Sequence, residues 1–435
     1  MGQWVGQSLA RCLAVLVTPL VVLGVLAGMA PAAAATLAAV PVSLQAAIGK
    51  SLGTAAPAAG YSQQAELTAS GGVPGGQFGQ SVALSARGTT ALVGAPVRDT
   101  GTGAVYVFTL RHGTWSQTAV LTASGGARFD SFGRSVALSA LGSTALVGAP
   151  GRHSDTGAVY VFTLRHGTWY QTAELTASGG GRLDELGFSV ALSAVGGTAL
   201  AGAPGRHAGT GAAYVFTLRR GTWSRTAELT ASHGAPDDGF GQSVALSALG
   251  GTALAAAPGR HADTGAGYVF TLRRGTWSRT AMLTGTRGDG FGFSVALSAL
   301  GSTALAGAPF HQTLTGAAYV FTLRRGAWSR TGVLTAPHGA PGDDFGQSVA
   351  LSAVGSTALA GDFGHSPFTG AAYVFTLRRG TWSRTARLTA SDAAPGDEFG
   401  YSLALSALGA TALAGAPFRH TSTGAAYVFT EGRGA

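Results

Sequence analysis

Arginine, histidine and acidic residues recur at regular intervals in this 435-residue chain, and they are its most chemically versatile side chains. The candidate residues for a ligand-binding face are Arg152, His153, Arg206, His207, Arg260, His261, His311, His365, Arg419 and His420. Acidic residues come shortly before most of them, at Asp130, Asp184, Glu185, Asp237, Asp238, Asp343, Asp344, Asp397 and Glu398. A histidine and a carboxylate that meet can exchange protons with a substrate or hold a metal ion together.

Three interpretations of these groups are open. They form exposed ion pairs in solvated loops, each worth less than about 1 kcal/mol. Alternatively, they build a multivalent surface for a polysaccharide or a protein. In the third interpretation, a histidine and carboxylates converge as acid and base. Because one histidine per repeat need not converge with the next, we assign no catalytic residue, no metal ligand and no cofactor-binding residue.

The chain contains no Walker phosphate loop, no Gly-x-Ser-x-Gly nucleophile turn and no His-Glu-x-x-His helix. Arg287-Gly288-Asp289 spells an integrin-recognition tripeptide. Arginine and glycine are so frequent in this sequence that chance explains the match.

The candidate residues lie in the loops of a repeated unit marked by a Phe-Gly pair, which the third unit replaces by Leu-Gly. The pairs begin at Phe78, Phe132, Leu186, Phe240, Phe291, Phe345 and Phe399, 54 residues apart except for one interval of 51. A period near 50 is typical of propeller blades. In the second unit, residues 135–140, 144–148, 158–164 and 169–178 have the apolar patterns of strands, and none carries a helical stripe. We therefore predict an all-β, seven-bladed β-propeller of four-stranded antiparallel blades.

The two ends of the repeated region complement each other. The last unit stops after its third strand, near Thr430, whereas residues 61–70 resemble a fourth strand without the other three. The N-terminal strand should therefore complete the last blade and close the ring. We expect the tryptophan of each fourth strand to pack over the next blade.

The turns assign the charges to two faces. Tight hairpins after the first and third strands share one face, here called the hairpin face, and the longer loops with the candidate residues share the other, the loop face. The hairpin face carries basic residues, called the Arg ring, at Arg111, His112, Arg165, His166, Arg219, Arg220, Arg273, Arg274, Arg324, Arg325, Arg378 and Arg379. Blade six is irregular at Asp362, Phe363, His365 and Phe368. We expect the loop between the second and third strands of that blade to be distorted. If any blade departs from the repeat symmetry, we expect it to be this one.

The first sixty residues differ from the rest. Residues 1–35 combine an apolar run with small residues at Ala30–Ala35, as a secretory signal peptide does, although an uncleaved membrane anchor is the alternative. Residues 36–60 are predicted to be an Ala-rich linker and residues 61–435 the propeller. Cys12 is the only cysteine, so a cleaved chain would contain no disulfide. The net charge of +9 favours acidic partners through its long-range field.

The motifs Phe-Gly-x-Ser-Val-Ala-Leu-Ser, Gly-Ala-Pro, Gly-Ala-x-Tyr-Val-Phe and Trp-Ser-x-Thr-Ala-x-Leu-Thr-Ala-Ser recur in register. Together they resemble the FG-GAP repeat over residues 61–430, as in the propeller of integrin α chains and in short bacterial relatives. The resemblance implies an extracytoplasmic propeller for adhesion or ligand binding. Integrin-type repeats often hold calcium in an Asp-rich loop after the Phe-Gly strand. Here that loop reads Ala-Leu-Gly-Ser or Ala-Leu-Gly-Gly, so neither calcium nor another cofactor is expected there.

The expected function is that of an exported, secreted or cell-surface binding or adhesion module, monomeric and without enzymatic activity. Its partner would be a protein or polysaccharide, with weak polyanion binding by the Arg ring, no specific nucleic acid, and membrane attachment only through an uncleaved leader. The alternatives are a carbohydrate-active propeller enzyme and a purely structural surface protein. An enzyme needs unlike residues from different blades at one site, whereas these loops largely repeat one another.

Overall fold

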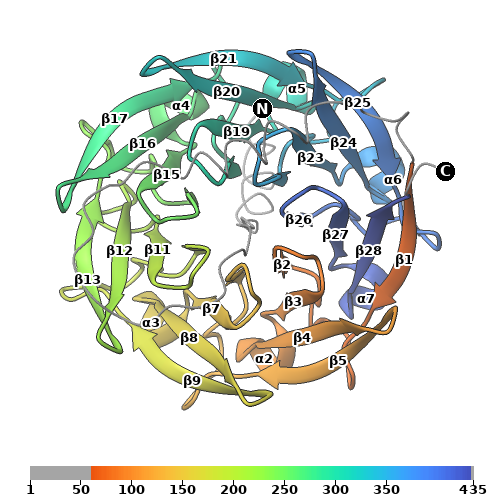
Figure 1. Ribbon diagram of the computed structural model, residues 1–435, viewed down its shortest axis with the longest axis horizontal. Coiled ribbons are helices and arrows are strands. Elements are labelled where there is room, and N and C mark those ends of the chain that lie inside the picture. The colour runs from red at the N-terminus through yellow and green to blue at the C-terminus, as the bar shows by residue number, and fades with distance from the viewer. Residues whose placement is uncertain (1–59, 433–435) are drawn as a thin grey trace, which may run out of the picture.

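The computed structural model describes residues 60–432, which form seven four-stranded antiparallel sheets arranged as blades around one axis (Figure 1). This confirms the predicted all-β, seven-bladed propeller. The predicted signal peptide and most of the predicted linker lie outside the described residues.

Blades one to six run from the axis to the rim in chain order, and blade seven ends at the rim with the N-terminal strand. Blades one to three consist of β2 (Ser81–Leu84), β3 (Thr90–Ala95), β4 (Ala104–Arg111) and β5 (Thr114–Leu121); β6 (Ser135–Leu138), β7 (Thr144–Ala149), β8 (Ala158–Arg165) and β9 (Thr168–Leu175); and β10 (Ser189–Leu192), β11 (Thr198–Ala203), β12 (Ala212–Arg219) and β13 (Thr222–Leu229). Blades four and five consist of β14 (Ser243–Leu246), β15 (Thr252–Ala257), β16 (Ala266–Arg273) and β17 (Thr276–Thr284); and β18 (Val295–Leu297), β19 (Thr303–Ala308), β20 (Ala317–Arg324) and β21 (Ala327–Leu334). Blades six and seven consist of β22 (Val349–Leu351), β23 (Thr357–Asp362), β24 (Ala371–Arg378) and β25 (Thr381–Leu388); and β26 (Ser402–Leu405), β27 (Thr411–Ala416), β28 (Ala425–Glu431) and β1 (Tyr61–Leu67).

The N-terminal strand closes the ring as predicted. In Figure 1 the red β1 lies beside the dark blue β28, and the two strands pair antiparallel from Tyr61 opposite Glu431 to Leu67 opposite Ala426. Leu67 is 2% exposed and belongs to the core between blades seven and one. The last blade therefore joins residues from both ends of the propeller.

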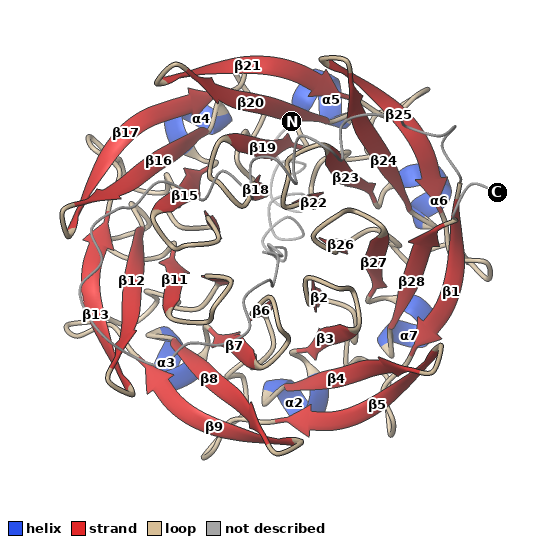
Figure 2. Ribbon diagram, viewed as in Figure 1, coloured by secondary structure: helices blue, strands red, loops and turns tan. Residues whose placement is uncertain are grey.

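Six loops between second and third strands contain a four-residue helical turn, on the outer side of the loop face in Figure 2. They are α2 (Arg98–Gly101), α3 (Arg152–Asp155), α4 (Arg260–Asp263), α5 (His311–Leu314), α6 (His365–Phe368) and α7 (Arg419–Ser422). The sequence analysis missed them because four residues cannot show a helical repeat, and most contain residues with left-handed backbone angles, such as His153 with φ of 54°.

The core lies between neighbouring blades. Between blades three and four, Leu200 and Val215 meet Tyr268 and Phe270, and all four side chains are buried. Trp277 packs against this same cluster, on the blade that precedes its own. The expectation that each tryptophan packs over the next blade was wrong, because strand alternation assigns a side chain to a face but not to a neighbour.

The Phe-Gly pair joins consecutive units. Phe240 packs edge-on against Tyr268, with ring centroids 5.4 Å apart, and forms a parallel bridge with Gly211. A Cβ on Gly211 would stand 2.1 Å from the Phe240 carbonyl oxygen. Leu186, which replaces phenylalanine in the third unit, is fully buried.

A closed ring of backbone hydrogen bonds surrounds the axis on the hairpin face. One alanine of each first hairpin donates its N–H to the equivalent carbonyl of the next blade, over 2.8–2.9 Å, in the order Ala86, Ala140, Ala194, Ala248, Ala299, Ala353, Ala407 and back to Ala86. We call these residues the alanine ring. It holds the inner ends of all seven blades to one another.

Candidate functional site

Six of the acidic residues in the loops between blades are buried and serve as structural anchors. Each accepts a hydrogen bond from the backbone N–H three residues earlier, over 2.7–2.9 Å; they are Asp130, Asp184, Asp238, Asp289, Asp343 and Asp397. Each is 3–5% exposed. Burying a carboxylate is costly without hydrogen bonds and a counter-charge, so each of these aspartates needs a basic partner.

The partner comes from the following blade, 22 residues later. The pairs, which we call latches, are Asp130–Arg152 (3.2 Å), Asp184–Arg206 (2.8 Å), Asp238–Arg260 (3.7 Å), Asp289–His311 (3.0 Å), Asp343–His365 (3.9 Å) and Asp397–Arg419 (3.8 Å). Each latch ties the loop before a blade to the loop between that blade's second and third strands. The interpretation as exposed pairs is wrong for these residues.

The ten candidate residues therefore divide into two groups. Arg152, Arg206, Arg260, His311, His365 and Arg419 point into the latches, with side chains 8–21% exposed. His153, His207, His261 and His420 are exposed. Of these, His153 lies 3.1 Å from Glu174 and His207 lies 3.9 Å from Glu228, each within its own blade. The structure distributes the ten residues around the ring and does not gather them at one site.

The tripeptide Arg287-Gly288-Asp289 is not presented to a partner. Asp289 is 3% exposed and accepts hydrogen bonds from Tyr319 (2.7 Å) and from His311 (3.0 Å). Although burial opposes ionisation, hydrogen bonds from Thr286, Tyr319 and His311 lower the pKa of Asp289. The carboxylate of this tripeptide is therefore buried in the latch of blade five and cannot contact a partner protein.

The axis at the loop face is filled by unlike side chains from different blades. Phe188, Phe293, Phe363 and Tyr401 form a buried cluster, and they come from blades three, five, six and seven. Side chains from blades so far apart can meet only near the axis. Arg134 lies over Phe188, 4.7 Å from the ring centroid. The repeat symmetry is therefore broken at the axis. Phe188, Phe293 and Tyr401 stand directly after a Phe-Gly or Leu-Gly pair, and Phe363 stands after β23.

A pocket of about 310 Å³ lies beside this cluster, between blades one, two and three. Phe129, Arg134, Glu185 and Phe188 contribute to its walls. Burial raises the pKa of Glu185, which Arg134 opposes. The pocket combines aromatic surface with both charges, so it suits a small polar ligand, but no catalytic arrangement is evident among these residues.

The hairpin face carries two concentric rings. The outer one is the Arg ring, whose members are all exposed. The inner one follows the alanine ring by one residue; it consists of Leu141, Val195, Leu249, Leu300, Val354 and Leu408, between 38% and 82% exposed, and we call it the aliphatic crown. Arg87 takes the equivalent position in blade one.

The sequence analysis overlooked the aliphatic crown, although a signal was present. A leucine or valine stands beside glycine at the tip of a two-strand turn in six repeats, where the fold offers it no burial. A repeated apolar residue at an exposed turn indicates a contact surface.

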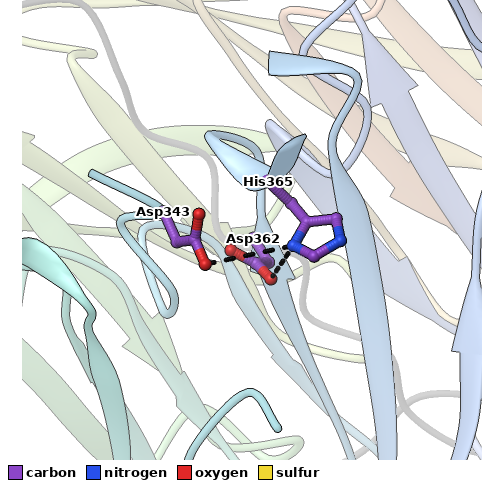
Figure 3. Close-up of side chains that lie close together, drawn as sticks. All are labelled: Asp343, Asp362 and His365. Carbon is purple, nitrogen blue, oxygen red and sulfur yellow. Dashed lines mark ion pairs between the residues drawn. The ribbon is translucent and has the colours of Figure 1, made fainter. Parts of the chain in front are cut away.

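Blade six brings three potential metal ligands together (Figure 3). His365 Nδ1 lies 3.5 Å from Asp362 Oδ2 and 3.9 Å from Asp343 Oδ2. Asp362 is 0% exposed, and burial together with Asp343 raises its pKa to about 8. The expected distortion of this loop is not found, because Asp362 pairs with Ala371 as Ala416 pairs with Ala425 in blade seven.

A family model for the FG-GAP repeat matches residues 61–108, 115–162, 169–216, 223–270, 328–375 and 382–429, which is more than half of the chain. The chain belongs to the FG-GAP repeat family. A comparison with curated proteins finds no match.

Each matched FG-GAP segment straddles two blades. The first, residues 61–108, begins on β1 of blade seven and ends on β4 of blade one. Residues 271–327 are unmatched and contain the shortened interval before Phe291, yet β18 to β20 lie within them and form a regular blade with β21. Within residues 60–432, the chain has no helix of the length and hydropathy needed to span a bilayer.

The latches of this FG-GAP propeller yield a stability prediction. Asp184→Asn removes the counter-charge of Arg206, whose side chain is 16% exposed, while keeping an acceptor for the Gly181 N–H. We expect the free energy of unfolding to fall by about 1–3 kcal/mol, because a largely buried guanidinium loses its charged partner and keeps only its hydrogen bond to the Gly179 carbonyl. Urea denaturation measures this change. The same replacement at the exposed Asp237 is the control, and an equal effect of the two variants would contradict the latch.

Proposed function

We propose that this protein is an exported binding or adhesion module that attaches to an acidic macromolecule through its hairpin face. The observation that supports this most strongly is the pairing of the exposed Arg ring with the aliphatic crown inside it. Arginine binds carboxylates, sulfates and phosphates in a planar, bidentate manner, and a ring of such groups binds multivalently.

The loop face is less suited to this role. Its arginines at Arg152, Arg206, Arg260 and Arg419 face buried carboxylates, so their charges are already compensated. In blade seven, β28 ends at Glu431, directly before the position that an Arg ring residue holds in the other blades. The hairpin face therefore gathers exposed arginines that face no buried carboxylate.

Family membership supports a binding rather than a catalytic role, since FG-GAP propellers are typically extracellular or surface-associated scaffolds without activity of their own. The hairpin loops lack the carboxylates that calcium in integrin-type repeats requires, so we propose no calcium there. In this proposed role the protein acts as a monomer and does not bind a specific nucleic-acid sequence.

The test is a binding assay with alginate, a polyanionic polysaccharide, and with phosphatidylglycerol vesicles, each at low and high salt. Reversing the charge of one arginine in each of blades three to six, in the variant R219E/R273E/R324E/R378E, should weaken binding about 1000-fold, because each of the four reversed charges costs of the order of 1 kcal/mol. Replacing Leu141, Val195 and Leu249 by serine should remove the part of the binding that survives high salt.

The matched control replaces His153, His207, His261 and His420 on the loop face by alanine and should leave binding unchanged. Binding that is lost in this control, and retained in the arginine variant, would assign the contact to the loop face. Shortening of the polysaccharide would favour the carbohydrate-active enzyme, and a lack of binding to either probe would favour a structural role.

A further inference from the structure

We propose that Asp343, Asp362 and His365 form a binding site for one divalent transition-metal ion, with Zn²⁺ as the best match. This inference is independent of the proposed function, since the site lies on the loop face of blade six and the proposed contact lies on the hairpin face.

The three ligands come from separate segments that the blade holds in place. Asp343 belongs to the loop before β22, Asp362 is the last residue of β23, and His365 is the first residue of α6. Their ligand atoms all lie within 4.8 Å of one another, with His365 Nδ1 at 3.5 Å and 3.9 Å from the two carboxylates. Ligand atoms bound to one tetrahedral Zn²⁺ stand about 3.3–3.5 Å apart, so a small contraction would complete the site.

The charges in blade six differ from those in the other latches. In blades two, three, four and seven one arginine faces the loop aspartate, and in blade five His311 faces Asp289. The position of Asp362 holds alanine in the other six blades, at Ala95, Ala149, Ala203, Ala257, Ala308 and Ala416. Blade six therefore places two carboxylates against one imidazole and no arginine of the latch type.

Asp362 is the carboxylate of this arrangement that has no latch arginine, although Arg387 and Tyr373 act to lower its pKa against the effect of burial. Its side chain is 0% exposed, and neither of its carboxylate oxygens makes a hydrogen bond. An ionised carboxylate buried in this way is strongly unfavourable unless a cation accompanies it. A divalent ion bound by two carboxylates and a neutral imidazole makes a site with no net charge.

The donor set selects the class of ion. Calcium and magnesium take oxygen ligands, whereas an imidazole nitrogen with two carboxylate oxygens suits Zn²⁺ and its transition-metal neighbours. The His365 side chain is 21% exposed, which leaves a side of the site open to solvent and to a fourth ligand such as water. The ion would hold the loop before blade six to that blade, as the arginine latches do elsewhere.

The test is calorimetric titration of the untagged, chelator-treated full chain with ZnCl₂, together with elemental analysis. We expect one equivalent of Zn²⁺ to bind and Ca²⁺ not to compete. Asp362→Ala should weaken binding at least 100-fold while the melting profile shows an intact propeller, because alanine occupies this position in every other blade. His365→Gln should also lose the site.

The matched control is His311→Ala, which removes the equivalent histidine of blade five, where one carboxylate is present. It should keep the full equivalent of Zn²⁺. Unchanged binding by Asp362→Ala, loss of binding in the His311 variant, or a preference for Ca²⁺ over Zn²⁺ would each overturn the proposal. If Asp362→Ala failed to fold, the His365→Gln titration would decide the matter.

Discussion

Removal of residues 61–70 is expected to open the ring and to destabilise the whole propeller. The deletion takes away β1, exposes the edge of β28 along its paired length, and removes the buried Leu67 from the core between blades seven and one. It also removes Glu66, which lies 3.1 Å from Arg419, a residue with a side chain 8% exposed.

These losses should act together. Truncating one buried leucine alone costs about 2–5 kcal/mol, and here a complete strand is lost with it. We therefore expect the unfolding free energy to fall by more than about 5 kcal/mol and the melting temperature by about 10 °C or more. Scanning calorimetry, with hydrogen exchange on β26 to β28, measures both effects.

The control is deletion of residues 1–59, which retains β1 and should leave the melting temperature of the propeller unchanged. If the deletion of 61–70 melted at the same temperature as this control, the strand would not be closing the ring.

Gly202→Ala should be among the most damaging single substitutions at the inner edges of the blades. Gly202 of β11 faces the next blade so closely that a Cβ would stand 1.8 Å from the Gly241 carbonyl oxygen. That oxygen also accepts a hydrogen bond from Ser189 Oγ over 2.8 Å, so the contact cannot widen without breaking it. We expect a loss of about 3 kcal/mol, the upper part of the range for overpacking.

Blade four provides the matched control, because it already carries Ala256 at the equivalent position. At this boundary Ser243 Oγ accepts from the Val295 N–H, over 3.0 Å, so the hydrogen bonding differs from that around Ser189. Ala256→Gly should change the unfolding free energy by less than about 1 kcal/mol. A small effect of Gly202→Ala in urea denaturation would mean that the blades can move apart at this boundary.

Most of the fold was predictable because each blade repeats the same local signals. The 54-residue spacing, the alternating strands and the separated fourth strand at residues 61–70 together specify the ring and its closure. The direction in which Trp277 packs was not predictable, because neighbouring blades have nearly the same sequence and only their arrangement in space distinguishes them.

The site was predictable in composition but not in geometry. The constant interval of 22 residues between Asp184 and Arg206 recurs in other repeats and could have indicated a pair. Whether that pair is buried depends on how the loops of successive blades meet, and the sequence of a single repeat does not contain this information. Asp362 was recognisable as an irregularity, but its approach to Asp343 depends on the return of β23 to the loop before β22.

The alanine ring has an electrostatic consequence. Its hydrogen bonds all run in the same rotational sense, from Ala86 through Ala407 and back to Ala86, so their peptide dipoles point along the circumference and their vector sum around the closed circle is close to zero. An α-helix adds its dipoles along one axis, whereas this circle cancels them. The alanine ring therefore adds no electrical polarity between the two faces of the disc, and exchanging charged residues at the hairpin tips would change that polarity without altering the ring.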